Sequence, residues 1–217
     1  MSLNPRVIIA LPKGRVYDQA KELLGRAGIA IPESENGSRK LVFADESGRY
    51  DFVPLKPIDI PVYVESGAID AGIVGTDILR ELDSDVYEPV DLRIGLCRLV
   101  VAAPQGLQVS IRDLLRVATK YPRTAEHFFR SRNIHVHIVK LDGSVEIAPL
   151  LGLAEAVIDL VETGRTLREN GMRIVEEIAQ VSAKLIINRT AMKMKSVDIN
   201  YLINPFKRNL FMKQISH

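Results

Sequence analysis

Residues 156–171 read AVIDLVETGRTLRENG, and this stretch decides how the chain folds. The apolar run 156–161 has the length and the β-branched content of a buried strand, and it stops at Glu162. A four-residue loop, 163–166, follows the strand, and a polar pattern with helical spacing follows the loop. A buried strand that leads through a short loop into a helix is typical of an α/β sheet.

The loop 163–166 collects hydrogen-bond donors. Gly164 leaves backbone N–H groups accessible, Thr163 and Thr166 add hydroxyls, and Arg165 adds a positive charge. A helix that begins near Thr166 would add its dipole. Such a set suits a phosphate monoester, although an ordinary strand–turn–helix connection is the alternative. The spacing GxxxxGK[ST] of a Walker loop is absent.

Two carboxylates precede this loop, namely Asp159 and Glu162. A carboxylate beside a phosphate would repel it, but a carboxylate accepts hydrogen bonds from sugar hydroxyls. The strand and loop together therefore predict a site for a phosphate and a sugar.

The same alternation of short apolar runs and helical patterns continues along the chain. We expect strands at 6–11, 39–44, 50–55, 98–104, 116–122, 135–141 and, once or twice, 175–189, and a strand that runs into a glycine turn at 70–77. Helices are expected at 15–27, 57–67, 123–132 and 196–214. This order predicts an α/β fold with largely parallel sheets, which bind ligands at the carboxyl ends of their strands.

Two loops in the first half of the chain follow expected strands. LPKGR, residues 11–15, places Lys13 and Arg15 around the flexible Gly14. This loop either binds an anion or is a turn with two solvated cations. In DAGIVGTD, residues 70–77, we expect a tight turn formed by Gly72 and Gly75. Thr76 either binds an anion or caps the next helix, and Asp77 is the alternative cap.

A third loop, DGSVE at 142–146, precedes the expected strand at 156–161. Ser144 and Glu146 have the spacing of a helix cap and its first turn. The alternative is that Glu146 binds ligand hydroxyls.

Composition excludes several classes of protein. The 217 residues include 29 basic and 27 acidic ones, a net charge of +2 that argues against a nucleic-acid surface. The single cysteine excludes an intrachain disulfide, and the four histidines lack metal-ligand spacing. The start of the chain lacks a secretory signal pattern, and no apolar run reaches bilayer length, so we expect a cytoplasmic protein that does not contact a membrane.

Five segments, in this order, resemble a known family: LPKGR (11–15), LKPIDIPVYVESGAIDAGIVGTD (55–77), CRLVVAAP (97–104), ATKYP (118–122) and DGSVEIAPLLGLAEAVIDLVETGRTLRENG (142–171). The chain resembles the ATP phosphoribosyltransferases that open histidine biosynthesis, from about Val7 to about Asn188. The resemblance implies two α/β lobes like those of type II periplasmic binding proteins, with two chain crossings between them. The expected lobes are 1–95 plus 184–217, and 96–183, the second of which carries the phosphate loop.

The resemblance also implies a reaction, in which N1 of the adenine of ATP joins C1 of phosphoribosyl diphosphate (PRPP) and diphosphate leaves. Mg²⁺ would be carried by the diphosphate, with no metal ligand from the protein. Lys13, Arg15 and Lys56 would offset the charge on the departing diphosphate. Family members often have arginine at position 56, and lysine lacks its bidentate fork.

The implied contacts with PRPP come from the second lobe. The 5-phosphate would bind to the loop 163–166, and Glu146 and Asp159 would lie near the ribose hydroxyls. Weaker candidates for substrate contacts are Gly14, Gly75 and Thr76 of the first lobe and Ser144 of the second.

The chain ends about one helix after the second crossing, so it resembles the short form of the family, which lacks a C-terminal regulatory domain. The implied assembly is a homodimer of catalytic chains joined into a hetero-octamer by a regulatory subunit similar to histidyl-tRNA synthetase. Two alternatives remain open at this point, namely a non-catalytic two-lobed protein that binds a small anion, and a regulatory or DNA-linked sensor domain.

Overall fold

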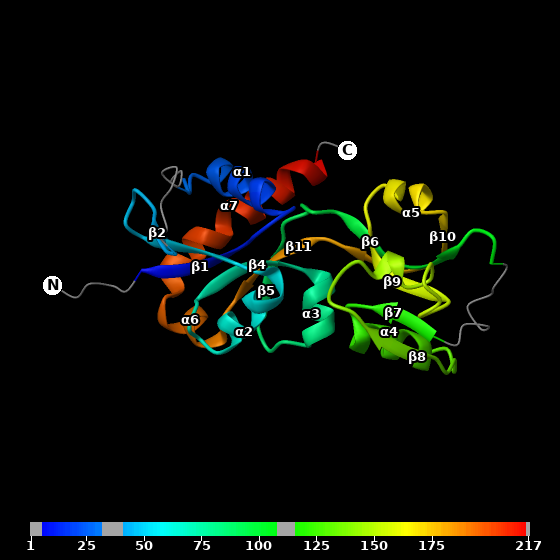
Figure 1. The fold of residues 1–217 in the computed structure, drawn as a ribbon. Helices are drawn as coiled ribbons and strands as arrows, with labels where there is room; N and C mark the ends of the chain where they lie inside the picture. The colour runs from blue at the N-terminus through cyan, green and yellow to red at the C-terminus, as the bar shows by residue number, and fades with distance from the viewer. Residues whose placement is uncertain (1–5, 32–40, 108–115, 216–217) are drawn as a thin grey trace. The chain divides into compact units, whose positions relative to one another are not determined.

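The computed structural model describes residues 6–31, 41–107 and 116–215, which form two compact units (Figure 1). Unit 1 comprises residues 1–79, 83–95 and 182–217, and unit 2 comprises residues 80–82 and 96–181. Each unit is built around its own sheet, and both units are discontinuous in sequence.

Unit 1 contains a six-stranded sheet in the order β2 (Phe43–Ala44), β3 (Tyr50–Leu55), β1 (Val7–Pro12), β4 (Ala71–Gly75), β11 (Ala183–Ile187) and β5 (Tyr87–Asp91). The three strands β3, β1 and β4 are parallel, so their carboxyl ends lie at one edge. The other three strands are antiparallel to their neighbours.

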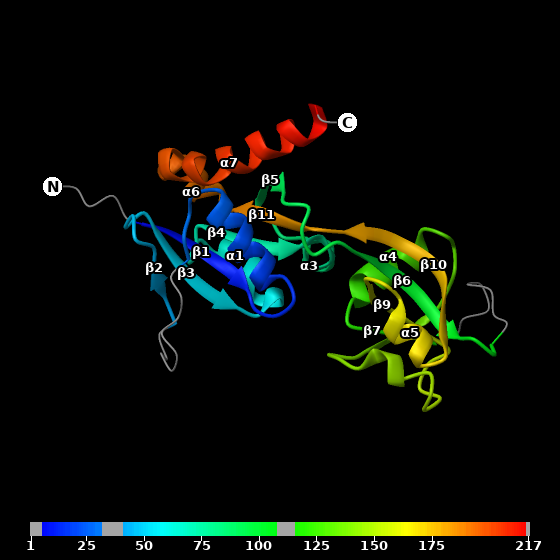
Figure 2. The ribbon, with the colours of Figure 1, turned by 90° about the horizontal axis from the view of Figure 1, so that it is seen from above.

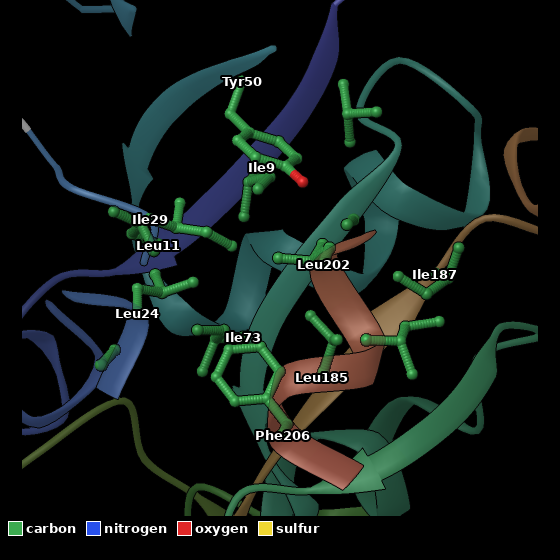
Figure 3. Close-up of a cluster of buried hydrophobic side chains, with 14 of the residues drawn as sticks. Ile9, Leu11, Leu24, Ile29, Tyr50, Ile73, Leu185, Ile187, Leu202 and Phe206 are labelled. Atoms are coloured by element: carbon green, nitrogen blue, oxygen red, sulfur yellow. The ribbon is translucent and has the colours of Figure 1, made fainter. Parts of the chain in front are cut away.

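One face of this sheet is covered by α1 (Tyr17–Arg26), α6 (Arg189–Met194) and α7 (Ser196–Ile215). Figure 3 shows the resulting core, in which Leu24 of α1 and Leu202 and Phe206 of α7 meet Ile9 and Ile73 of the sheet. The final helix therefore belongs to the same core as the first strand.

The opposite face is covered by η1 (Pro57–Asp59) and α2 (Ile60–Glu65). Gly72 allows this approach, because a Cβ atom there would lie 2.6 Å from Cγ2 of Ile60 and 3.2 Å from Cγ2 of Val64. The predicted turn at Gly72 is wrong, because Gly72 lies within β4. Helix α3 (Thr76–Leu82) begins directly after β4.

Unit 2 contains a five-stranded sheet in the order β10 (Met172–Val181), β6 (Cys97–Pro104), β9 (Ala156–Val161), β7 (Arg116–Thr119) and β8 (His137–Lys140). Figure 2 labels the first four of these strands. Strands β9, β7 and β8 are parallel. Helix α4 (Pro122–Arg130) packs on one face, and η3 (Val145–Ile147) and α5 (Arg165–Glu169) pack on the other.

The predicted α/β fold is confirmed, but the prediction of largely parallel sheets is wrong. Both sheets are mixed, and in each one only three adjacent strands run parallel. The expected strand at 39–44 is confirmed only for Phe43–Ala44, and residues 39 and 40 lie outside the described ranges. None of the helices in the described ranges has the length and apolarity needed to cross a bilayer.

An ion pair holds the junction of α6 and α7 to the amino ends of strands β1 and β4 in unit 1. Lys195 Nζ lies 2.7 Å from Asp70 Oδ2 and donates to the carbonyl of Arg6, and Asp70 also accepts from the backbone N–H of Ile8. The two side chains are only 16% and 10% exposed.

We expect Lys195→Met to lower the free energy of unfolding by about 2 kcal/mol, because it leaves the Asp70 carboxylate poorly compensated. Urea unfolding measures the change, and the double variant Asp70→Asn/Lys195→Met should recover part of the loss. Equal stability of Lys195→Met and wild type would contradict this role of the pair.

The buried phenol of Tyr50 leads us to expect that the protein loses stability at alkaline pH. Burial raises the pKa of Tyr50 to about 12, from 10.0 for the free phenol. Between these values the unfolded chain loses the phenolic proton while the native protein keeps it, so stability falls as pH rises through this window. We expect Tyr50→Phe to flatten this fall, measured by urea unfolding at about pH 9 and about pH 11. Tyr87 is exposed, so Tyr87→Phe is the control. If the free energy of unfolding of Tyr50→Phe fell with pH as steeply as that of wild type, Tyr50 would not be the group responsible.

Candidate substrate-binding loops

Lys13 and Lys56 follow neighbouring parallel strands in unit 1. The backbone N–H of Lys13 donates to the carbonyl of Leu55 (2.8 Å), the residue that precedes Lys56. Both lysine side chains are exposed, and neither forms an ion pair with another residue of the described ranges. The carboxyl edge of β1 and β3 therefore carries two ammonium groups that could face an anion.

The next two residues of this loop have different roles. Gly14 adopts φ +91°, which favours glycine, although a Cβ atom there would contact nothing within 4 Å. Arg15 Nη2 donates to the carbonyl of Gly95 (3.0 Å). The backbone N–H of Gly95 donates to Oε1 of Gln19 (2.7 Å). Part of the Arg15 guanidinium is therefore used to hold the segment that follows β5.

The loop after β4 corrects one prediction. Helix α3 is capped by neither Thr76 nor Asp77, because its N-cap is Gly75 and no side chain makes a capping hydrogen bond. The Thr76 hydroxyl instead accepts from the N–H of Ser182 (3.3 Å), while the N–H of Thr76 donates to the carbonyl of Ser182 (2.9 Å). A side chain at Gly75 would clash with the Asp77 carboxylate.

In unit 2, three loops follow the parallel strands β9, β7 and β8. The loops after β9 and β8 are anchored on the same face of the sheet, because Val145 of η3 and Leu167 of α5 belong to one buried cluster with Val157 and Val161 of β9. The unit thereby brings residues 144–146 and 163–166 to the face on which β9 carries Asp159.

The loop 163–166 has the geometry of a tight turn into a helix. Gly164 adopts φ +73° and is the N-cap of α5, which begins at Arg165 and is five residues long. The N–H of Arg165 faces the Thr163 hydroxyl at 3.4 Å. The Arg165 side chain extends along the exposed surface to Glu169 (2.7 Å). Thr163 and Thr166 are both exposed residues.

Ser144 and Glu146 flank the first residue of η3. Ser144 is the N-cap by position, but its side chain makes no capping hydrogen bond, so the predicted cap is wrong. Its backbone is left-handed (φ +47°), a conformation that non-glycine residues rarely adopt and that is often retained at functional sites. Glu146 is half-buried, and no residue of the described ranges forms an ion pair with it.

Lys120 is a residue of this edge that the sequence did not single out. It follows β7, and its Nζ atom lies 3.4 Å from Oδ1 of Asp159 on β9. That oxygen is buried and has no hydrogen-bond partner among the described residues. The pattern ATKYP shows a lysine directly after a buried strand. It could not reveal that the partner of this lysine is Asp159, which lies on another strand.

A pocket of about 290 Å³ lies elsewhere in unit 2. It is lined by residues of α4 and of the segment that leads into β8, including Phe129, Arg130 and His135. None of the predicted site residues lines it. Within the described ranges, no group of three or more histidine, cysteine, aspartate or glutamate side chains could hold a metal ion.

These features define an α/β protein of two units, each with a mixed sheet and with polar loops at the carboxyl ends of three parallel strands. The family model for ATP phosphoribosyltransferase, HisG, matches residues 56–208. An ATP phosphoribosyltransferase of Caldanaerobacter subterraneus is 49% identical over 197 residues, which cover 91% of this chain and 94% of the relative. One from Syntrophotalea carbinolica is 44% identical over 215 residues, which cover 96% and 97%.

The chain therefore belongs to the ATP phosphoribosyltransferase family. It is a pentosyltransferase of histidine biosynthesis, which transfers the phosphoribosyl group of PRPP to N1 of ATP and releases diphosphate.

Solved structures agree on the fold. The chain is similar to the ATP phosphoribosyl transferase (HisG:HisZ) complex from Thermotoga maritima, with a TM-score of 0.80, 28% identity and coverage of 93% of this chain and 96% of that one. It is also similar, at 13% identity and a TM-score of 0.60, to the substrate binding protein of an amino acid ABC transporter, with coverage of 98% and 95%. The second likeness concerns the fold alone. The comparisons thus favour the transferase over the alternative of a non-catalytic anion-binding protein.

Proposed function

We propose that the loops of unit 2 bind the phosphoribosyl part of PRPP. The observation that carries this proposal is that residues 144–146, 163–166 and Asp159 gather on one face at the carboxyl ends of parallel strands. The hydroxyls of Thr163 and Thr166 and the N–H groups beside Gly164 bind the 5-phosphate, with Arg165 adding charge. Asp159 and Glu146 accept hydrogen bonds from the ribose hydroxyls, and Ser144 supports that contact.

Unit 1 supplies the positive charge for the leaving group in this proposal. Lys13 and Lys56 follow adjacent strand ends, so their ammonium groups can approach the same diphosphate. Arg15 contributes less, because one of its nitrogens already binds Gly95. The backbone at Gly14 and Gly75 and the hydroxyl of Thr76 line the same edge of the sheet.

The reaction needs charge stabilisation more than a protein nucleophile. The bond from C1 of the ribose to the diphosphate oxygen breaks, the electron pair leaves with the diphosphate, and N1 of the adenine attacks C1. The sugar carries positive charge in the transition state while negative charge grows on the diphosphate. Lysine ammonium groups placed beside that diphosphate stabilise the transition state more than the ground state.

We propose that Mg²⁺ enters with PRPP, bound to the diphosphate oxygens. The donor set of the described residues supports this, because it offers isolated carboxylates rather than a cluster of metal ligands. When bound, Mg²⁺ supplies further positive charge to the leaving group.

The assembly is also a proposal. The solved structure from Thermotoga maritima is a HisG:HisZ complex, which supports a regulatory partner of the HisZ type for this chain. We propose a homodimer of catalytic chains, joined by partner subunits similar to histidyl-tRNA synthetase into a hetero-octamer. A cytoplasmic location is consistent with ATP and PRPP as substrates.

A product assay tests the assignment. The purified chain is mixed with ATP, PRPP, Mg²⁺ and pyrophosphatase, and phosphoribosyl-ATP is measured by mass spectrometry, with and without the partner subunit. We expect product in at least one of the two mixtures. Binding of PRPP without product in either mixture would favour a non-catalytic binder instead.

A further inference from the structure

Lys120 and Asp159 are brought together by strand register. Strands β7 and β9 are parallel, with Thr119 beside Ile158, so the next residue of each strand also lies side by side. The buried Thr119 hydroxyl fixes this end of β7, because it donates to the carbonyl of Ile158 and accepts from the N–H of Tyr121, both at 2.9 Å. The backbone around Lys120 is therefore held from both sides.

The Asp159 carboxylate lies in apolar surroundings. Val157 and Val161, two residues away on either side along β9, share its face of the sheet and are at most 5% exposed. A carboxylate oxygen buried there needs a compensating charge or donor. Among the described residues, Lys120 is the cation within ion-pair distance of it.

The two carboxylate oxygens have different environments. Oδ1 is buried and lies 3.4 Å from Lys120 Nζ, which is longer than the approximately 2.7–2.9 Å of a charge-assisted hydrogen bond. The Asp159 side chain as a whole is 27% exposed, so its exposed surface belongs to the remaining atoms, Oδ2 included. The carboxylate thus directs one oxygen to the lysine and leaves the other accessible.

We propose that Lys120 is a positioning residue, which orients Asp159 and balances its charge so that Oδ2 accepts from a ribose hydroxyl of PRPP. This inference rests on the proposed function, in which Asp159 contacts the ribose. Lys120 also lies over the ring of Tyr121, 5.4 Å from its centroid, and this contact restricts the ammonium group further. The pair then lets a carboxylate lie close to the 5-phosphate site without full repulsion.

Binding of sugar phosphates distinguishes a Lys120 that positions Asp159 from a Lys120 that contacts the phosphate directly. Dissociation constants are measured by calorimetry for ribose 5-phosphate, 2-deoxyribose 5-phosphate and 3-deoxyribose 5-phosphate with the full chain. We expect wild type to prefer ribose 5-phosphate over at least one deoxy sugar by about tenfold. Lys120→Met should lose most of that preference, as Asp159→Asn should, and the double variant should lose no more than either single variant.

Controls and kinetics complete the test. Lys120→Arg keeps the charge and should restore the preference, whereas Lys140→Met, an exposed lysine at the end of β8, should leave it unchanged. Lys120→Met should raise KM for PRPP by about tenfold with little change in kcat or in KM for ATP.

Each remaining outcome overturns one claim. Equal weakening of all three sugar phosphates would assign Lys120 to the phosphate itself and refute the positioning role. An unchanged preference in a folded Lys120→Met would show that the pair is only structural. Failure of wild type to bind either PRPP or ribose 5-phosphate would overturn the proposed function, and with it this inference.

Discussion

Lys13→Met is expected to lower kcat by about 10²–10³-fold without unfolding the protein, a loss comparable to removing one preorganised donor from an enzyme's oxyanion hole. The ammonium group follows β1 at the carboxyl edge of the sheet, where its backbone is tied to Leu55 and its side chain is exposed. Removing it deletes charge from the position where we place the departing diphosphate. Initial rates at saturating ATP and PRPP measure the loss, and thermal unfolding checks the fold.

Lys193→Met is the matched control. Lys193 is an exposed lysine of the same unit, but it lies on α6, which follows β11 at the amino end of β4, where Ile187 pairs with Ala71. It therefore lies at the opposite edge of the sheet and should keep wild-type kcat. Lys13→Arg should retain part of the activity, since it keeps the charge. A kcat for Lys13→Met close to that of Lys193→Met would remove Lys13 from the catalytic set.

Local sequence patterns were sufficient where a strand places its own apolar residues in the core. The apolar run 156–161 predicted β9, and the structure has the strand at Ala156–Val161. The same holds for the strand expected at 50–55. The buried residues are Tyr50 and Phe52 in β3, and residues 156–158 and Val161 in β9.

The sequence did not reveal strands, or strand directions, that depend on pairing with a strand distant in the chain. Strand β5 contains Glu88, Pro89 and Asp91, which disfavour a strand, and only its Val90 is buried. It forms because β11, almost 100 residues later, pairs with it. The antiparallel direction of β11 is likewise set by pairing with β4, and this made the prediction of largely parallel sheets wrong.

In the candidate site too, local features were visible in the sequence, whereas contacts between distant residues were not. The composition of the loop 163–166 was visible locally, whereas the left-handed backbone of Gly164 is a finding of the structure. The partners of two other residues were not visible, because they are distant in sequence. Thr76 does not cap its helix because its hydroxyl binds Ser182, 106 positions later. Lys120 gained its place beside Asp159 only through the register of β7 and β9.

Gly164→Val is expected to raise KM for PRPP by about 100-fold, because displacing a binding group by even 1 Å can cost that much. Gly164 adopts φ +73°, and a β-branched side chain strongly disfavours this conformation, at a cost of about 1–2 kcal/mol or more. Its added atoms would also meet Arg168 Nη1 at 3.4 Å and Val161 Cγ1 at 3.7 Å. The turn would shift, and the N–H groups that we assign to the 5-phosphate would shift with it.

Gly171→Val separates loop geometry from general strain. Gly171 is also left-handed (φ +66°), but it follows the other end of α5, where a Cβ atom would meet nothing within 4 Å. Both variants should therefore lose similar stability in thermal unfolding. If the loop 163–166 binds the 5-phosphate, only Gly164→Val should raise KM for PRPP, with KM for ATP unchanged in both. An equal rise in the two variants would mean that strain around α5, rather than the phosphate loop, controls PRPP binding.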